Sequence, residues 1–320
     1  MIWYTAPSYK LGFSKMGTIT HDINLIIAAL NRGEIAAIPT ETVYGLAGNA
    51  ENSSAIQQIY TLKQRPLNHP LIMHIAKDAD LTRWATAIPD YVETLITHFW
   101  PGPLTLVLPC LPSQINPLVT SGQTTVAIRA PSHPLAQQLL SLLNFPLVAP
   151  SANRFGKISP TTAAHVQDSF NNDELLILDG GRCAIGIEST IVAATNPNGY
   201  QILRHGMIDE AMLHQVLPGL ELPRDEKIRI SGNLDTHYQP EKPLYYFTDR
   251  NLAKQFCAQH SAVVVSLKQE SSTAAYELYY QLRAADKSSA DIILIELPPV
   301  TSSWKGTRER IMKAGRTLKL

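Results

Sequence analysis

Short apolar segments recur along the chain, and stretches with helical spacing of apolar residues lie between several of them. The apolar segments predict strands at residues 35–39, 71–75, 104–108, 125–129, 147–149, 175–178, 190–194 and 201–204. The helical patterns fall at residues 21–33, 52–63, 91–99, 134–143 and 208–216, and residues 40–48 are expected to form a polar turn. Strands that alternate with helices are typical of α/β folds. The pattern therefore predicts a mixed α/β domain over residues 1–220.

A segment rich in proline and glycine separates this domain from a more regular C-terminal part. Residues 221–243 carry charged residues between their prolines and glycines, a composition typical of a linker or a lid. Beyond it, strands are expected at 244–247, 262–267 and 291–296, with helices at 273–285 and 305–314. This alternation predicts a small parallel sheet with right-handed crossovers over residues 244–320.

The charge balance and the cysteines exclude some classes of protein. The chain of 320 residues has 27 basic and 27 acidic residues, which argues against a histone-like or coat-like nucleic-acid binder but not against a local basic groove. Its three cysteines form no Cys-x-x-Cys pair, which excludes a zinc ribbon and favours a reducing cytoplasm. No apolar run approaches the roughly 18 residues of a membrane span. The first 17 residues lack the apolar core of a signal peptide, so we expect a cytoplasmic protein.

Several common nucleotide and metal signatures are absent from the sequence. It contains no G-x-x-x-x-G-K-[ST], no G-x-G-x-x-G and no H-E-x-x-H. Ligand sites of α/β folds usually lie on the loops that follow strands, so the functional evidence rests on those loops. Five of them carry hydroxyl and cationic side chains with few carboxylates, which favours an anionic, phosphorylated ligand over a metal-hydrolase centre. These loops are residues 39–46, 63–70, 125–131, 149–160 and 179–190.

Individual residues in these loops have more than one interpretation. Lys63 and Arg65 flank one residue, so they suit a phosphate chain or a carboxylate, or else they neutralise a helix C-terminus. Arg129 ends an apolar strand and is expected to bind either an anionic ligand or a structural carboxylate. His74 lies on an apolar strand, where a hydrogen-bonded core histidine is the ordinary case. Ser151 lacks the spacing of a nucleophile elbow, which favours a grip on a nucleotide over nucleophilic catalysis.

Five motifs, taken in order, resemble those of one family. They are Pro-Thr-Glu-Thr-Val-Tyr-Gly-Leu at 39–46, Lys-x-Arg-Pro at 63–66, Pro-Leu-Ile-x-His at 70–74, Ala-Pro-Ser-Ala-Asn at 149–153 and Gly-x-Glu-Ser-Thr-Ile-Val at 186–192. Their order and spacing over roughly residues 17–215 resemble the YrdC-like family of threonylcarbamoyl-AMP synthases. The remainder is similar to the extra C-terminal domain of the long form of that family. The resemblance implies a twisted mixed sheet with helices, joined by a lid-like linker to a small Rossmann-like parallel α/β domain.

The resemblance also implies a reaction. L-threonine, bicarbonate and ATP yield L-threonylcarbamoyladenylate, pyrophosphate and water, with Mg²⁺ held mainly by the ATP phosphates. The product feeds N6-threonylcarbamoyladenosine formation beside the anticodon of tRNA, which a partner threonylcarbamoyl transferase complex completes. A weak contact with tRNA is expected as well, and no contact with a membrane. The reaction needs no nucleophilic side chain, because positioning and charge stabilisation supply most of the catalysis.

The family's functional residues carry over to matching positions of this chain. Lys63 and Arg65 are then the phosphate clamp and the catalytic residues, and Arg129 pairs with the substrate carboxylate as a bidentate fork. The implied threonine pocket consists of Thr42, His74, Arg129, Ala149, Ser189 and Thr190. The implied ATP contacts, besides Lys63 and Arg65, are His69, Thr125, Ser151, Asn153, Ser159, Arg204 and Tyr238.

Two segments depart from the family pattern. The family often has Asn at the position of His69, whereas this chain has the order Asn68-His69. The linker of the long form usually reads Ser-Pro-Gly-Met-Lys-x-Arg-His-Tyr-x-Pro, and in the family it covers the active site. Here the Met, Lys and Arg are replaced, which predicts a looser lid and poorer product retention. The positions that remain are Gly232, His237, Tyr238 and Pro240.

Two other functions stay open at this point. The concave surface of this fold suits an RNA-binding module without ATP turnover, and residues 304–320 are rich in Lys and Arg. We expect those cations, Arg310 among them, to form a solvated helix face instead. A carbamoyl-phosphate-using relative is also conceivable, since YrdC-like domains occur in hydrogenase-maturation carbamoyltransferases. Those chains carry zinc-finger-like parts, and the absence of Cys-x-x-Cys disfavours that interpretation.

Overall fold

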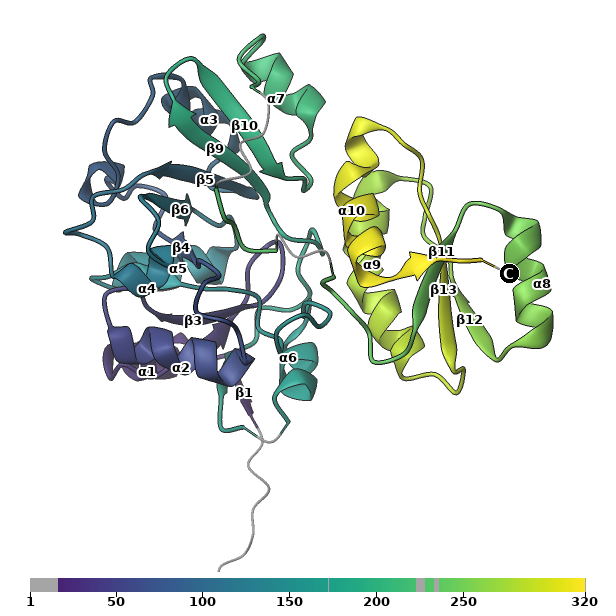
Figure 1. Ribbon diagram of the computed structural model, residues 1–320. Coiled ribbons are helices and arrows are strands. Elements are labelled where there is room, and N and C mark those ends of the chain that lie inside the picture. Colours follow the sequence, from purple (N-terminus) through teal and green to yellow (C-terminus); the bar gives the residue numbers. More distant parts are fainter. Residues whose placement is uncertain (1–16, 172, 223–227, 233–235, 320) are drawn as a thin grey trace, which may run out of the picture.

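The computed structural model describes residues 17–171, 173–222, 228–232 and 236–319, which form two parts that each contain their own sheet (Figure 1). The larger part holds the purple to teal segments of the chain, and the smaller part holds the green to yellow ones. The expectation for the N-terminal segment and the linker departures at Asn233 and Leu234 lie outside the described residues, whereas the departure at Thr236 is described and exposed.

The larger part is built on one twisted sheet of ten strands in the order β1-β8-β2-β3-β7-β4-β6-β5-β9-β10. The sheet is mixed, since β4 pairs with β6 in parallel and β5 pairs with β6 antiparallel. This confirms the expected fold class. The strands are β1 (Thr18–Thr20), β2 (Ala36–Ile38), β3 (Gly45–Asn49), β4 (Ile72–His74), β5 (Leu104–Pro109), β6 (Thr125–Arg129), β7 (Leu147–Val148), β8 (Leu176–Leu178), β9 (Thr190–Asn196) and β10 (Gly199–Arg204).

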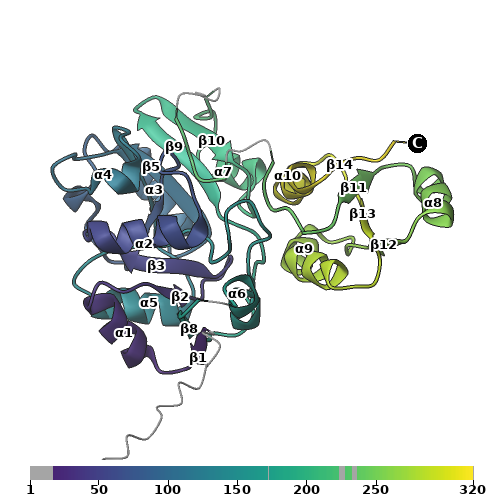
Figure 2. The same cartoon turned by 60° about the horizontal axis from the view of Figure 1, so that its bottom comes forward.

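Helices pack on both faces of this sheet, because successive side chains of a strand point to opposite faces. In β2, Ala36 and Ile38 join the apolar cluster under α1 and α5, whereas Ala37 joins the cluster under α2 and α6. Figure 2 shows α2 and α1 on opposite sides of the strands. The helices are α1 (Ile23–Asn31), α2 (Ser53–Lys63), α3 (Tyr91–Phe99), α4 (Pro117–Thr120), α5 (Pro134–Leu142), α6 (Ala163–Ser169) and α7 (Glu210–Val216), with a 3-10 turn η1 (Leu81–Arg83).

The expected polar turn over residues 40–48 is wrong from Gly45 onward, because Gly45–Asn49 forms strand β3. Its glycines serve close packing rather than a turn. A Cβ at Gly45 would lie 3.0 Å from the Cβ of Ala149 on the neighbouring segment. Glycine within a strand often marks such a close approach.

The smaller part has a sheet of four strands in the order β12-β13-β11-β14, and every pair in it is parallel. Helices α9 and α10 cover the side of the sheet that faces the larger part, and α8 covers the other side (Figures 1 and 2). The predicted parallel α/β fold is confirmed, although α8 was not expected. The elements are β11 (Leu244–Phe247), α8 (Arg250–Gln259), β12 (Ala262–Val265), α9 (Ser271–Asp286), β13 (Ile292–Glu296), η2 (Ser302–Trp304), α10 (Lys305–Ala314) and β14 (Arg316–Thr317).

The two parts meet closely at a pair of glycines. A Cβ on Gly306 of α10 would lie 2.9 Å from the carbonyl oxygen of Gly206. This distance is shorter than real Cβ contacts allow. The guanidinium carbon of Arg182 in the larger part lies 3.7 Å from the ring centroid of Tyr276 in the smaller part. The contact between the parts therefore includes a close backbone approach at Gly306 and a cation–aromatic contact.

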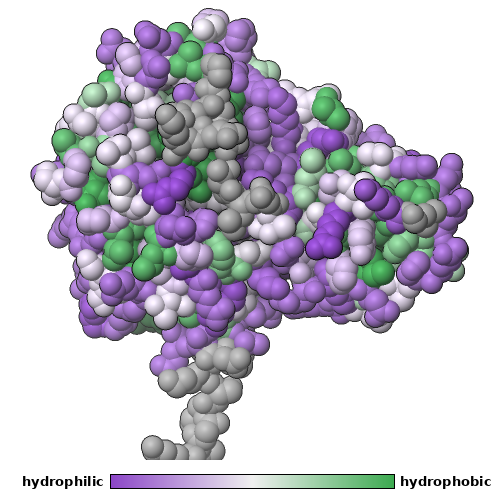
Figure 3. All heavy atoms as spheres, viewed as in Figure 1, coloured by the Kyte–Doolittle hydropathy of each residue, from purple (hydrophilic) through white to green (hydrophobic). Residues whose placement is uncertain are grey.

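The surface is largely polar. On the face in Figure 3, hydrophilic residues predominate and apolar ones are scattered among them. The most exposed of the large apolar residues is Val300, at 81%. Within the described part of the chain, no helix combines the length and the apolar character that a membrane crossing requires.

Candidate active site

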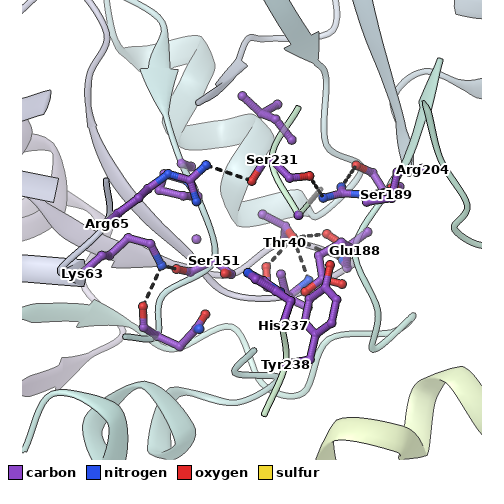
Figure 4. Close-up of a pocket in the computed structure, with 18 of the residues that line it drawn as sticks. Thr40, Lys63, Arg65, Ser151, Glu188, Ser189, Arg204, Ser231, His237 and Tyr238 are labelled. Atoms are coloured by element: carbon purple, nitrogen blue, oxygen red, sulfur yellow. Dashed lines mark hydrogen bonds between the residues drawn. The ribbon is translucent and has the colours of Figure 1, made fainter. Parts of the chain in front are cut away.

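A small cavity lies where the loops around the strand ends of the large sheet meet the linker (Figure 4). Its space is about 40 Å³, which is room for a few water molecules. Linker residues form one wall of it, so the cavity as it stands is closed to a large ligand. The lining residues are Thr40, Thr42, Val43, Gly45, Lys63, Arg65, Ile72, His74, Arg129, Ala149, Pro150, Ser151, Asn153, Phe155, Gly156, Glu188, Ser189, Arg204, Ser231, Gly232, His237 and Tyr238.

Lys63 stands at the end of α2, and its side chain reaches across to the loop after β7. The Nζ atom donates to the carbonyl oxygens of Ser151 and Asn153, the latter at 2.6 Å. Burial drives the pKa of Lys63 well below its usual range, and the charge of Arg65 adds to this, while Glu188 opposes it. An ammonium has three N–H donors, so one of them remains for a ligand.

Arg65 follows α2 and is held by backbone carbonyls. It donates from Nε to His69 at 3.3 Å and from Nη2 to Pro70 at 2.9 Å. Nη2 also donates to the hydroxyl of Ser231 on the linker, at 3.3 Å. Burial lowers the pKa of Arg65 to about 10, so this group keeps its charge at neutral pH. The αL conformation of Gln64, with φ of 55°, ends α2 and turns the chain between Lys63 and Arg65.

Arg204 ends β10 and binds both a neighbouring loop and the linker. It donates from Nε and Nη2 to the carbonyl and hydroxyl of Ser189, each at 3.1 Å, and from Nη1 to the carbonyl of Ser231 at 3.0 Å. Ser231 therefore accepts from two buried arginines, through its hydroxyl from Arg65 and through its carbonyl from Arg204 (Figure 4).

Arg129 at the end of β6 already holds a carboxylate of this chain. Its Nη2 lies 2.6 Å from Oε1 of Glu41, Nη1 donates to the Thr42 hydroxyl at 2.9 Å, and Nε donates to the Gly102 carbonyl at 3.1 Å. Burial pushes the pKa of Glu41 up, but the charge and hydrogen bond of Arg129 outweigh this and hold it below the usual value. The sequence predicts that Arg129 binds either an anionic ligand or a structural carboxylate, and the structure contains the structural carboxylate, Glu41.

His74 ends β4 beside Arg129 and is neutral. Its Nδ1 lies 3.2 Å from the carbonyl oxygen of Ile72. A carbonyl can only accept, so Nδ1 carries the proton and Nε2 is left as an acceptor. Burial and the charge of Arg129 lower the pKa of His74 to about 3. At neutral pH this ring therefore accepts a hydrogen bond rather than carrying a charge.

Glu188 is the carboxylate that lines the cavity. Its Oε1 accepts from the Ser159 hydroxyl at 2.5 Å, and its Oε2 accepts from the Tyr279 hydroxyl at 2.9 Å and from Nε of Arg310 at 3.0 Å. Burial by itself would raise the pKa of Glu188, but the charges of Arg310 and Arg204 and the hydrogen bonds bring it down to about 2. The smaller part of the molecule thus reaches the cavity through this residue.

We expect Glu188 to make unfolding depend on acid. Its pKa falls from 4.5 to about 2 on folding, which corresponds to about 3 kcal/mol of stability that is present above pH 4.5 and lost as the pH falls towards 2. Urea unfolding from pH 7 to pH 2 measures this, and Glu188→Gln should flatten the curve between those two pKa values. Glu34→Gln, at an exposed pair with Arg32, is the control. An unaltered slope in the Glu188 variant would contradict the assignment.

The linker covers the cavity with an aromatic pair. His237 packs edge-on against Tyr238, with ring centroids 4.0 Å apart, and the Tyr238 ring stacks on Tyr279 at 5.7 Å. Tyr238 has a φ of 64°, a conformation that is costly for a bulky residue. Gly232 has a φ of 85°, and a Cβ there would lie 2.9 Å from the Tyr238 hydroxyl. Burial and the charge of Glu188 raise the pKa of Tyr238, so its phenol stays protonated.

The structure brings most of the expected site residues together and leaves four outside the cavity lining. The ones it gathers are Thr42, Lys63, Arg65, His74, Arg129, Ala149, Ser151, Asn153, Ser189, Arg204 and Tyr238. Thr125 lies at the opposite end of β6 from Arg129, in a separate small crevice with Ile230 and Ser231. The Thr190 hydroxyl donates to the Ile208 carbonyl. His69 packs edge-on against Phe155. The Ser159 hydroxyl donates a hydrogen bond to Glu188 without lining the cavity itself.

Sequence reasoning did not select several residues that shape the cavity. Thr40, Phe155 and Ser231 line it, and Arg310 and Tyr279 control its carboxylate. The expected solvated position of Arg310 is wrong, because this side chain is only 1% exposed. A signal was present: Gly306 and Arg310 are four residues apart and so share a helix face. A glycine on that face indicates close contact with another part of the chain.

The cavity offers cations rather than metal ligands. Within the described residues, no group of three or more His, Cys, Asp or Glu side chains is arranged to hold a metal ion. Its buried basic residues are Lys63, Arg65, Arg129 and Arg204, and its buried acidic residue is Glu188. Such an excess of positive charge suits an anionic ligand with several negative groups.

Two family models match the chain. Residues 28–206 match the Sua5/YciO/YrdC model, whose description is "Telomere recombination". Residues 208–315 match the model described as "Threonylcarbamoyl-AMP synthase, C-terminal domain".

Known proteins are similar over the same range. Threonylcarbamoyl-AMP synthase of Bacillus subtilis is 36% identical over 322 residues, which covers 91% of this chain and 93% of that protein. Threonylcarbamoyl-AMP synthase of Pyrococcus abyssi is 39% identical over 227 residues, which covers 68% of this chain and 65% of the archaeal protein. The crystal structure of P. abyssi Sua5 complexed with L-threonine superposes with a TM-score of 0.82 at 29% identity, covering 95% of this chain and 99% of that chain.

Proposed function

Since the chain belongs to the Sua5/YciO/YrdC family in its two-domain, threonylcarbamoyl-AMP synthase form, we propose that its cavity makes L-threonylcarbamoyladenylate from L-threonine, bicarbonate and ATP. The observation that carries this proposal is the gathering of four buried cations, Lys63, Arg65, Arg129 and Arg204, around one cavity. Residues 1–220 form the catalytic domain, residues 221–243 the lid, and residues 244–320 the C-terminal domain.

The cations divide between the two substrates. Lys63 and Arg65 hold the ATP phosphates, through the N–H groups that their backbone carbonyl partners leave over. Ser151, Asn153 and Tyr238 contact the nucleotide, and Arg204 fixes the linker over it through the Ser231 carbonyl. Because the cavity has little free space, the linker has to move aside before ATP enters.

The threonine end of the cavity lies around Arg129. Its remaining N–H donors take the substrate carboxylate, while Glu41 and Thr42 keep the guanidinium in place. Nε2 of the neutral His74 accepts a hydrogen bond from threonine. With a pKa of about 3, His74 is too weak a base to take up a proton at neutral pH, so it orients the substrate. The complex of the archaeal relative with L-threonine supports this substrate.

The chemistry then needs two bond-forming steps. The lone pair of the threonine amine attacks the carbon of bicarbonate, and water leaves to give the carbamate. A carbamate oxygen attacks the α-phosphorus of ATP, and the bond to the β-phosphate oxygen breaks with its electron pair leaving on pyrophosphate. Lys63 and Arg65 stabilise the charge that develops on this leaving group. We expect any Mg²⁺ to be held mainly by the ATP phosphates.

The product is a reactive mixed anhydride, so a transferase must consume it. We place that step in a partner complex that passes the threonylcarbamoyl group to tRNA in the cytoplasm. The RNA-binding alternative gains no support from the basic tail. Arg310 is buried, Lys305 binds Glu210, and Lys313 binds Glu309, so these cations are already engaged within the protein.

Pyrophosphate release from ATP tests the proposed function. Purified protein with Mg²⁺ and bicarbonate should release pyrophosphate when L-threonine is added and much more slowly with L-serine, which lacks the methyl group. Omission of bicarbonate should stop release, because no carbamate forms. Threonine-independent release, or none from folded protein that binds ATP, would contradict the proposal. Salt-dependent retention of RNA in that second case would favour the RNA-binding module.

A further inference from the structure

Helix α10 inserts one charged side chain against Glu188, a residue that lines the cavity. Arg310 is 1% exposed, and each of its nitrogens has a partner in the larger part. Nε donates to Oε2 of Glu188 at 3.0 Å, Nη1 donates to the carbonyl of His205 at 2.5 Å, and Nη2 donates to the carbonyl of Glu188 at 3.3 Å. Arg310 thus fixes both the side chain and the backbone of Glu188.

The same side chain also lies behind the lid. The guanidinium carbon of Arg310 is 5.5 Å from the ring centroid of Tyr238, the linker residue with a φ of 64°. A cation over an aromatic face is attractive, the more so when both are buried. One turn further along α10, Lys313 donates to the Gly232 carbonyl at 2.8 Å and its own carbonyl accepts from the backbone N–H of His237. One helix therefore contacts the lid on both sides of residues 233–235.

Glu188 is in turn surrounded by groups that respond to its charge. From the elements packed around it, the groups that face it are Ser159, Tyr279, Arg310, Arg204, Lys63, His237 and Tyr238. The negative charge of Glu188 raises the pKa of Lys63 and so offsets part of the lowering that burial causes. Lys63 belongs to the proposed phosphate clamp. A change in the position or charge of Glu188 therefore alters the pKa of Lys63, a proposed catalytic residue.

We propose that Arg310 is a positioning residue for the reaction, through which the C-terminal domain fixes the Glu188 carboxylate and the Tyr238 ring at the catalytic cavity. It touches no substrate itself. It keeps Glu188 ionised and in place, and its guanidinium group packs against the ring of the lid residue Tyr238. The C-terminal domain is then part of the active site rather than an appended binding module.

Arg310→Met tests this, with Arg316→Met as the matched control, because Arg316 is exposed on the same domain. The inference rests on the proposed function, so threonine-dependent pyrophosphate release by the unaltered protein is established first. Arg310→Met should lower kcat about 100-fold, since the loss of one preorganised electrostatic group of an active site costs about 10²–10³ in kcat, whereas Arg316→Met should match the unaltered protein. Equal kcat in Arg310→Met would overturn the inference without touching the proposed function.

The pH profile separates positioning from a merely structural role. Without Arg310, the Glu188 carboxyl keeps its burial but loses its nearest cation, so its pKa rises and kcat should acquire an acid limb between pH 5 and pH 7, about tenfold in depth. Arg310→Lys retains the charge and should remove that limb even where kcat stays reduced. A lower kcat with an unchanged pH profile in Arg310→Met would show a structural role and overturn the proposal.

A second variant covers the case in which Arg310→Met does not fold. Tyr279→Phe removes one hydrogen bond to Oε2 of Glu188 and leaves the aromatic stack with Tyr238 in place. It should reproduce the acid limb at smaller depth, about threefold, in a protein that unfolds at nearly the same temperature. A pH profile identical to that of the unaltered protein would count against control of the cavity through Glu188.

Discussion

Lys63→Met is expected to reduce threonine-dependent pyrophosphate release by about two to three orders of magnitude while the protein stays folded. The ammonium is the donor that the clamp offers to the leaving pyrophosphate, and the loss of one such preorganised group costs about 10²–10³ in kcat. Single-turnover measurements of pyrophosphate release give this rate directly. Lys77→Met, at an exposed position that lines no part of the cavity, is the control.

The stability of Lys63→Met shows whether a lower rate comes from lost catalysis or from unfolding. Burial lowers the pKa of Lys63, so its charged form destabilises the folded state at every pH below the pKa of the unfolded chain. Methionine removes that cost but leaves the carbonyls of Ser151 and Asn153 without their donor. The two effects oppose each other, and we expect the free energy of unfolding to change by less than about 2 kcal/mol. A rate near that of the unaltered protein would remove Lys63 from the clamp.

Arg129→Met is expected to destabilise the protein by about 3–5 kcal/mol, because it leaves Glu41 buried without its cation. The double variant Arg129→Met with Glu41→Gln removes the stranded charge and should recover most of this loss. Urea unfolding of the two single variants and the double variant measures the coupling between the residues.

Activity of the double variant distinguishes the two roles of Arg129. If Arg129 also takes the threonine carboxylate, threonine-dependent pyrophosphate release stays lost in the double variant even though its stability returns. Isothermal titration with L-threonine should then detect no binding to a folded protein. Recovery of threonine binding together with stability would show that Arg129 serves Glu41 alone, and the carboxylate site would have to lie elsewhere.

Local patterns predicted most of the larger sheet because each strand carries its own signal. The helix at 91–99 and the strand at 125–129 have the predicted bounds, and Asn52 caps α2 through its side chain, as its type suggests. The turn assigned to residues 45–48 failed because glycine has two uses, conformational freedom and close packing, and composition does not distinguish them. Helix α8 was missed because charged and polar residues dilute its apolar face, of which Ala253 and Phe256 are the buried members.

The sequence motifs predicted most of the site residues that lie in the larger part of the molecule. Lys63 and Arg65 lie at the end of α2, Arg129 ends β6 and Arg204 ends β10, and each of these three segments carried a readable signal. Thr125 failed to reach the cavity because a strand of five residues separates its two ends, so a motif that spans the strand does not bring both ends to the ligand. Arg310 escaped notice because its burial depends on the docking of another domain. Gly306 on the same helix face indicates a close contact, but no local pattern identifies the residue 122 positions away that Arg310 binds.

The contact between Gly206 and Gly306 sets a rule for exchanging domains within this family. With no side chain on Gly306, the backbones themselves determine how near the two halves come at this point, and no rotamer change can absorb a mismatch. A chimaera that joins this catalytic half to a foreign C-terminal half would need a glycine at the position of Gly306. The backbone of the catalytic half at Gly206 therefore constrains which residue the other half can carry at position 306.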